Sequence, residues 1–151
     1  MDMQETGHTE NRDGVRLSRS LTLPNDVQTI PQLGEFVDGV GESLGLDMSL
    51  TMSLNLAIEE AVVNVMNYAY DAGTVGEVRI DVEVAGNAMT VVISDSGRAF
   101  DPTQQPMADT TLSLEERQVG GLGIFLVRQL MDDIRYERVG DRNVLTLYKK
   151  I

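Results

Sequence analysis

The spacing of apolar residues changes along this chain between two periods, one typical of strands and the other typical of helices. In some segments apolar and polar residues alternate, or a short apolar run lies between turn residues, and both patterns predict β-strands. In others apolar residues recur every three or four positions, which predicts amphipathic helices. The chain is therefore expected to form an α+β domain. The predicted strands are 16–23, 77–84, 88–94, 134–138 and 144–149, and the predicted helices are 27–46, 47–70 and 124–132.

The second predicted helix has the clearest signals for its start, its end and its buried face. Asp47 or Ser49 can cap its first turn, and Gly73 stops it. Its apolar residues follow a regular spacing of four and three, which defines one buried stripe. The predicted stripe consists of Leu54, Ile58, Ala61, Val65 and Tyr68.

The length of 151 residues fits one domain, to which the first residues are not expected to belong. A chain of this size can enclose one core but not separate catalytic and regulatory domains. Residues 1–15 carry few bulky apolar groups, so we expect them to form a disordered arm. The predicted organisation is an arm at 1–15 and a single domain at 16–151.

Charge and composition exclude several classes of function. The formal net charge of -12 would repel nucleic acid phosphates, so a nucleic acid is not an expected partner. The absence of cysteine excludes disulfides, thiolate metal sites and cysteine nucleophiles. The start of the chain lacks the features of a secretory signal, and no apolar run approaches the roughly 20 residues that span a bilayer. A cytoplasmic protein with no membrane partner is expected.

The first segment that can carry chemistry lies on the second predicted helix. Glu60 and Asn64 are four residues apart and so share one face of the helix, which continues with Asn67 and Asp71. Magnesium prefers oxygen ligands and keeps several waters, so one amide oxygen together with substrate phosphates can hold it. A nearby carboxylate could accept a proton from an attacking hydroxyl. Taken alone, the same pattern also fits a solvated helix face.

The second segment is Asp95-Ser96-Gly97, at the end of an apolar strand and shortly before Phe100. A half-buried carboxylate at a strand end can accept a hydrogen bond from the exocyclic amine of adenine. A glycine beside it lets the backbone pass close to the base. The alternative is a turn in which aspartate and glycine serve only the turn geometry.

The third segment, Gly120-Gly121-Leu122-Gly123, opens the last predicted helix. Glycines allow backbone N–H groups to point at an anion, and the helix dipole favours phosphate there. It is neither a Walker loop nor a dinucleotide fingerprint, and a flexible junction is the alternative. The long loop before it, 97–120, is predicted to be a functional lid with at most one short helical turn near 114–117.

Together and in this order, the three segments resemble the N, G1 and G2 boxes of a known ATPase superfamily. It groups gyrase, the heat-shock chaperone, histidine kinases and mismatch-repair ATPases. Within it, segments 59–64, 95–102 and 120–132 resemble the anti-sigma-factor serine kinases of sporulation and stress control. The resemblance runs from about residue 17 to 149. It implies a two-layer α+β sandwich of the Bergerat type, with a mixed, mostly antiparallel sheet covered on one face by helices.

The resemblance also implies a role for each motif residue. By position, Asn64 would bind magnesium, Glu60 would be the catalytic general base, and Asp95 would hold the adenine of ATP. Gly97 would flank the base, and Gly120, Gly121, Leu122 and Gly123 would line the phosphates. The implied partners are an antagonist-domain protein that is phosphorylated on serine, a sigma factor, and a second copy of the chain.

The chain departs from its relatives at two places, and these departures keep alternatives open. Val119 precedes the glycine pair where some relatives have glycine or arginine, and Asp141-Arg142-Asn143 stands where relatives often have Gly-Thr. Nucleotide binding tolerates such changes better than phosphoryl transfer does. The alternatives are a nucleotide-dependent binding switch without kinase activity and a scaffold that binds no nucleotide. Autophosphorylation of the histidine-kinase type is not expected, because the single histidine, His8, lies in the predicted arm.

Overall fold

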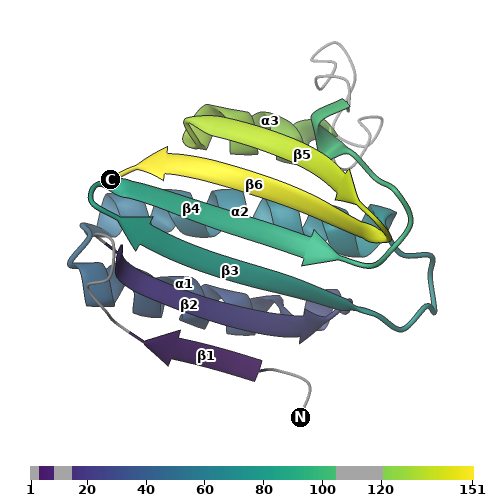
Figure 1. Ribbon diagram of the computed structural model, residues 1–151, viewed down its shortest axis with the longest axis horizontal. Helices are drawn as coiled ribbons and strands as arrows, with labels where there is room; N and C mark the ends of the chain where they lie inside the picture. Colours follow the sequence, from purple (N-terminus) through teal and green to yellow (C-terminus); the bar gives the residue numbers. More distant parts are fainter. Residues whose placement is uncertain (1–3, 9–14, 105–120) are drawn as a thin grey trace.

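The protein is a sheet covered on one face by helices, as the computed structural model shows for residues 4–8, 15–104 and 121–151 (Figure 1). All three α-helices lie behind the sheet in this view. The expected α+β sandwich is therefore confirmed. In chain order the elements are β1 (Gln4–His8), β2 (Val15–Pro24), η2 (Val27–Thr29), α1 (Ile30–Leu44), α2 (Met48–Tyr68), β3 (Glu77–Ala85), β4 (Ala88–Asp95), η3 (Pro102–Gln104), α3 (Gly121–Leu130), β5 (Asp133–Val139) and β6 (Arg142–Lys150).

The sheet has six strands in the order β1-β2-β3-β4-β6-β5. Each neighbouring pair in the described residues is antiparallel, so the mixed sheet that we expected is not found there. The hairpins β3–β4 and β5–β6 account for part of this, because tight turns join only antiparallel strands. Gly86 and Gly140 in these turns have φ of 59° and 62°, which glycine adopts without strain.

The first strand differs from our expectation of a disordered arm at 1–15. Residues Gln4–His8 pair antiparallel with β2, with Glu5 opposite Leu21. The outer edge of β2 carries unpaired backbone N–H and C=O groups, which an extended segment can satisfy without apolar side chains. The pairing of β1 therefore needs none of the hydrophobic signals on which the sequence prediction depended.

The core lies between the sheet and the helices, and alternation along the strands builds it. In β3 the residues Val78, Ile80, Val82 and Val84 are buried, while charged residues between them lie on the other face. The predicted stripe of α2 is buried from Leu54 to Val65. Asp47 caps this helix as predicted, since its Oδ1 accepts a hydrogen bond from the backbone N–H of Leu50 at 2.7 Å.

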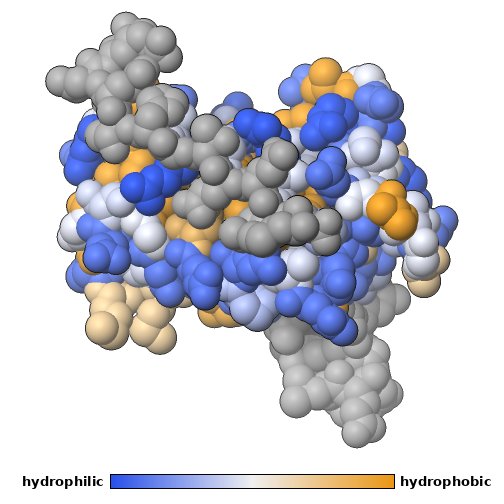
Figure 2. Space-filling model, turned by 90° about the horizontal axis from the view of Figure 1, so that it is seen from below, coloured by the Kyte–Doolittle hydropathy of each residue, from blue (hydrophilic) through white to orange (hydrophobic). Residues whose placement is uncertain are grey.

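The outer surface is mostly polar. Figure 2, which views the molecule from below, shows mainly hydrophilic residues, with only small orange areas between them. A few large apolar side chains are nevertheless exposed on α2, namely Met48, Met52 and Leu56. Within the residues that the structure describes, no helix is both long enough and apolar enough to cross a bilayer.

Helix α1 forms despite three internal glycines, and one of them is required by its contact with α2. A Cβ atom at Gly41 would lie 2.6 Å from Oγ1 and 2.9 Å from Cγ2 of Thr51, which is closer than atoms can approach. A Cβ at Gly39 would meet its nearest neighbour, Arg19, at an ordinary 3.6 Å. Gly41 therefore sets how closely the two helices pack, whereas Gly39 does not.

We predict opposite effects of alanine at these two positions. Gly41→Ala should lower the free energy of unfolding by about 1–3 kcal/mol through overpacking against Thr51. Gly39→Ala should raise it by about 0.5–1 kcal/mol, because alanine favours the helix. Urea denaturation of both variants measures this. In a Thr51→Ala background the cost of Gly41→Ala should disappear; an equal cost there would contradict the steric explanation.

Candidate functional site

The three motifs come from elements that meet at one end of the domain. Asp95 is the last residue of β4, Asn64 lies in the C-terminal half of α2, and α3 begins at Gly121. Helix α2 contacts both α3 and β4. Figure 1 shows the arrowhead of β4 on the same side of the molecule as the N-terminal end of α3. Gly120 and the predicted turn at 114–117 lie outside the described residues.

Asp95 ends a row of residues on the helix-facing side of β4 and is almost completely buried. Its predecessors in the row, Met89, Val91 and Ile93, belong to the core, and Asp95 itself is 1% exposed. Its Oδ1 accepts hydrogen bonds from the backbone N–H of Gly97 at 2.8 Å and from Nδ2 of Asn143 at 3.0 Å. Its Oδ2 is buried without a hydrogen-bond partner in the described structure. An unpaired buried carboxylate oxygen is costly, so it calls for a donor from a ligand.

The charge of Asp95 is also held at a cost. Burial raises the pKa of its carboxyl, although hydrogen bonds from Asn143 and Gly97 and the charges of Arg138 and Arg142 lower it in part. A carboxyl whose pKa is higher in the folded than in the unfolded state stabilises the fold only at low pH. That contribution is lost as the pH rises through the folded-state pKa. A charge that costs stability at neutral pH is typical of functional residues.

Asn64 is the second buried polar group of the site. It is 3% exposed, and its Nδ2 has no hydrogen-bond partner within the described residues. Glu60, one turn earlier on α2, is half-buried. An asparagine can bind a cation through its amide oxygen and a phosphate oxygen through its amide nitrogen. The predicted pair of Glu60 and Asn64 is therefore present on one helix.

The rest of the polar series predicted on this helix points elsewhere. Asn67 is exposed, and Asp71 lies beyond the end of α2, where it pairs with Arg98 at 3.1 Å. In the described parts of the chain no group of three or more acidic or histidine side chains could hold a metal ion. Any magnesium bound at Asn64 would therefore take its other ligands from phosphates and water, as this ion commonly does.

Glu59, the neighbour of Glu60, has a different environment. Burial raises the pKa of its carboxyl, and the nearby carboxylates of Glu60 and Asp38 raise it further. Asp38 belongs to α1 and accepts a hydrogen bond from Asn55 of α2. Glu59 therefore lies toward α1, whereas Glu60 shares its helix face with Asn64.

The loop after β4 packs closely against the end of α2 and is hydrogen-bonded to it. A Cβ atom at Gly97 would lie 2.3 Å from the carbonyl oxygen of Ala69, so only glycine fits. The backbone N–H of Arg98 donates to the same oxygen at 2.9 Å. The ring of Phe100 then stacks on that of Tyr68, with centroids 5.5 Å apart. Gly97, which we expected to flank a base, thus already has a packing reason to be glycine.

The glycine motif stands at the N-terminus of α3, as predicted. The helix runs over ten residues, Gly121–Leu130, and Ile124 and Val127 are buried on its inner side. Its first backbone N–H groups have no carbonyl partner within the helix, which makes this end suitable for an anion. The N-terminus of α3 lies on the side of the domain where β4 ends with Asp95 (Figure 1).

Sequence reasoning missed one residue of the site. Asn143 of β6 is 3% exposed and lies directly opposite Asp95 in the β4–β6 pairing. A signal did exist, because Asn143 continues the inward-facing row of Leu145 and Leu147 along the strand. A polar residue in a buried row is unusual enough to mark a site.

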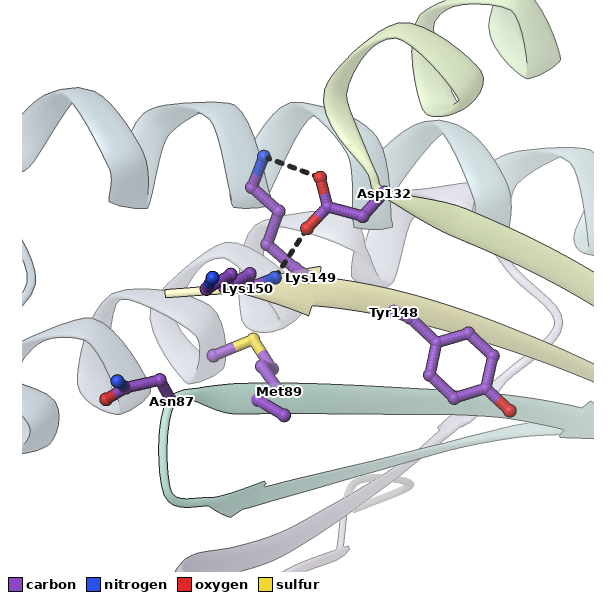
Figure 3. A pocket seen from close by; sticks show the side chains of 7 residues that line it. Asn87, Met89, Asp132, Tyr148, Lys149 and Lys150 are labelled. Carbon is purple, nitrogen blue, oxygen red and sulfur yellow. Dashed lines mark hydrogen bonds and ion pairs between the residues drawn. The ribbon is translucent and has the colours of Figure 1, made fainter.

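Two hollows on the described part of the surface are not lined by Asn64, Asp95 or Asn143. One, of about 400 Å³, lies at the other end of β4 and β6 from Asp95 (Figure 3). There Oδ2 of Asp132 accepts a hydrogen bond from the backbone N–H of Lys150 at 2.6 Å. Oδ1 of Asp132 lies 3.9 Å from Nζ of Lys149. A second, of about 550 Å³, lies between η2 and the segment after α2. Asp95 and Asn64 are distinguished instead by a buried side-chain atom without a hydrogen-bond partner, a feature that they share with Asn55 among the described residues.

Comparison with known proteins gives the same assignment as the motifs. A family model, that of the histidine kinase-like ATPase domain, matches residues 23–149. The serine/threonine-protein kinase BtrW of Bordetella bronchiseptica is 32% identical over 98 residues, covering 65% of this chain and 69% of that protein. The serine-protein kinase RsbW of Listeria monocytogenes is 28% identical over 117 residues, covering 74% of each chain. The serine-protein kinase RsbW of Bacillus subtilis is 31% identical over 105 residues, covering 67% of this chain and 66% of that protein.

A solved structure supports the fold. The histidine kinase domain of a blue-light-activated histidine kinase from Erythrobacter litoralis superposes with a TM-score of 0.53 at 14% identity. The match covers 85% of this chain and 61% of that one. The resemblance indicated by the three motifs is thus confirmed in both sequence and fold, and the chain belongs to the family of the histidine kinase-like ATPase domain.

Proposed function

We propose that this protein binds ATP with magnesium and phosphorylates a serine of an antagonist-domain partner. The observation that carries the proposal is a buried side-chain atom without a hydrogen-bond partner on each of two predicted site residues, Oδ2 of Asp95 on β4 and Nδ2 of Asn64 on α2. Each of these atoms is costly to bury unless a ligand bonds it. A third unpaired atom in the described residues, Oδ1 of Asn55, belongs to a side chain that bonds Asp38 of α1. The names of the serine kinases that this chain resembles support the choice of reaction.

Each described residue has a part in this proposal. The Oδ2 of Asp95 accepts the hydrogen bond of the adenine amine, and Phe100 and Tyr68 close one side of the same region. The amide oxygen of Asn64 binds magnesium, which would neutralise charge on the phosphates. Gly121, Leu122 and Gly123 begin α3, whose free N–H groups suit phosphate oxygens, and Gly120 precedes them in the sequence.

Glu60 is proposed to act as the general base. Its carboxylate lies one helical turn from Asn64, so a serine hydroxyl brought to the phosphate end would be within its reach. The hydroxyl would lose its proton to Glu60 as its oxygen bonds to the γ-phosphorus, and the bond from that phosphorus to ADP would break. The products are a phosphoserine and ADP.

The partners are proposed from the resemblance alone. An antagonist-domain protein would supply the serine, and a sigma factor would be sequestered in alternation with it in the cytoplasm. A second copy of the chain is a further proposed partner. A net charge of -12 argues against a nucleic acid in any of these roles.

A second candidate is a binding switch that uses ATP without transferring its phosphate. One observation favours it: neither α1 nor α2 contains a lysine or arginine. Phosphoryl transfer needs positive charge near the γ-phosphate in addition to magnesium. This protein would then bind its partner in a nucleotide-dependent way, and no phosphoserine would form.

Thermal denaturation with and without Mg-ATP tests nucleotide binding first. A ligand present at about 100 times its Kd stabilises the folded state by about 2.7 kcal/mol, so the melting temperature should rise by several degrees. Mg-GTP at the same concentration is the control and should give a smaller shift. An unchanged melting temperature in Mg-ATP would leave only the reading of a scaffold without nucleotide.

We predict that Asp95→Asn weakens ATP binding without weakening the fold. Loss of a hydrogen bond to a charged group should lower the affinity by about tenfold to a hundredfold. The melting temperature should equal or exceed that of the wild type, because the variant removes a carboxyl whose pKa is raised by burial and whose charge therefore costs stability. Calorimetric titration with Mg-ATP and a melting curve measure the two effects.

Asp81→Asn is the control for this variant, because Asp81 lies on the face of β3 opposite to the buried residues and pairs there with Arg79. Its ATP affinity should remain that of the wild type. If Asp95→Asn instead lowered the melting temperature while ATP affinity held, Asp95 would be a turn residue only.

The catalytic role is tested at the two consecutive glutamates. Glu60→Gln should slow phosphate transfer from Mg-ATP to a candidate antagonist-domain protein by about a hundredfold or more, with ATP affinity nearly unchanged. Glu59→Gln is the matched control, since Glu59 faces Asp38 of α1 and should leave the rate intact. Mass spectrometry of the antagonist measures phosphoserine. Equal rates for wild type and Glu60→Gln would refute the role of Glu60.

The metal role of Asn64 has its own test. Asn64→Ala should remove the difference between ATP affinity measured with magnesium and with EDTA, because the variant lacks the amide oxygen. Asn67→Ala, one turn on and exposed, should retain that difference. If Asn64→Ala kept the wild-type difference between ATP affinity with magnesium and with EDTA, Asn64 would not be the magnesium ligand.

A further inference from the structure

Asn143 occupies the centre of a hydrogen-bond network that joins three strands and one loop. It is directly opposite Asp95 of β4 on one side and directly opposite Arg138 of β5 on the other. Its side chain faces the helices, in the same row as Leu145 and Leu147, and is 3% exposed. A buried asparagine in this row costs stability unless every polar atom is bonded.

Both N–H donors of the Asn143 amide are used. Nδ2 donates to Oδ1 of Asp95 at 3.0 Å and to the carbonyl oxygen of Arg98 at 2.7 Å. These two partners can only accept hydrogen bonds, since one is a carboxylate and the other a backbone carbonyl. The nitrogen of the amide must therefore face Asp95 and the loop that follows β4.

The oxygen of the same amide is also fully used. Oδ1 of Asn143 accepts hydrogen bonds from the backbone N–H of Phe100 at 3.1 Å, from Nη1 of Arg138 at 3.2 Å and from the hydroxyl of Tyr136. The N–H groups of Phe100 and Arg138 can only donate. The orientation of the amide is thus fixed from both sides, and the flipped orientation would set donors against donors.

We infer that Asn143 is the positioning residue for base recognition: its amide decides which oxygen of Asp95 remains free and ties Phe100 to the same point. This inference rests on the proposed function, because it assigns Asn143 to the adenine end of that site. Asn143 itself needs no contact with the nucleotide. It acts through Asp95 and through the backbone at 98–100.

The arrangement at Asp95 follows from this fixed amide. Asn143 and the backbone N–H of Gly97 both donate to Oδ1, so one oxygen takes two hydrogen bonds and the other takes none. Without Asn143 the carboxylate would keep only the bond to Gly97 and could rotate to share its oxygens. A rotating carboxylate discriminates poorly between a base that has an amine donor and one that lacks it.

The second effect of Asn143 is on the loop. Its bonds to Arg98 and Phe100 fix both ends of a short stretch, and Phe100 stacks on Tyr68 of α2. Arg138 adds a bond from its Nη1 to the carbonyl oxygen of Gly97 at 2.9 Å. The carboxylate and the aromatic side chain are therefore positioned by one amide, and base recognition should depend on it more than overall folding does.

The experiment compares Kd for Mg-ATP with Kd for the Mg complex of purine riboside triphosphate, which has hydrogen in place of the 6-amino group. The wild type should prefer ATP by about tenfold or more, the effect of one hydrogen bond to a carboxylate. In Asn143→Ala this preference should fall below about threefold. Tyr136→Phe is the control: it removes one bond to Oδ1 of Asn143 but keeps both of its donors, so the preference should remain.

The outcomes separate the inference from the proposed function. Equal loss of affinity for both nucleotides in Asn143→Ala, with the preference kept, would make Asn143 a structural residue and overturn the inference alone. Wild-type protein that binds neither nucleotide would overturn the proposed function, and the inference with it. If Asn143→Ala fails to fold, Asn143→Ser serves in its place: it retains a small polar group but is too short to hold Asp95, and a preference kept there overturns the inference.

Discussion

The burial of one carboxylate at the end of a central strand constrains the rest of this structure. Asp95 is 1% exposed, yet it closes a row of core residues on β4. Its charge can stay there only because an amide and a backbone N–H bond one oxygen, while arginines lie near. The strand order provides this amide, because β6 lies next to β4 and places Asn143 opposite Asp95.

Helix α2 has to satisfy two demands that a single stripe of apolar residues could not. Its inner face buries Leu54, Ile58 and Val65 against the sheet, and Asn64 is buried with an amide nitrogen that has no hydrogen-bond partner in the described residues. The buried apolar residues stabilise the fold, and the unpaired amide nitrogen lowers the stability of the fold as long as no ligand bonds it. Under the proposed function, this loss of stability is exchanged for a binding site.

The sequence predicted most of the framework, because period, caps and turns are local properties. The strands, the helices and the Asp47 cap are all present near their predicted bounds. What it could not predict depends on distant neighbours: β1 pairs through its backbone, and Gly97 is required by the carbonyl of Ala69. Asn143 was seen only as a departure from relatives, since nothing local reveals that it lies opposite Asp95.

The three buried polar residues at this end of the domain lie on regular elements, and the loop beside them is held in place. Asn64, Asp95 and Asn143 come from a helix and two paired strands, so backbone hydrogen bonds fix each before any ligand binds. The loop between them is held by Gly97, Arg98 and Phe100 against the end of α2. Under the proposed function, groups fixed in advance would lose little entropy when a base binds, so even one unpaired carboxylate oxygen could select it.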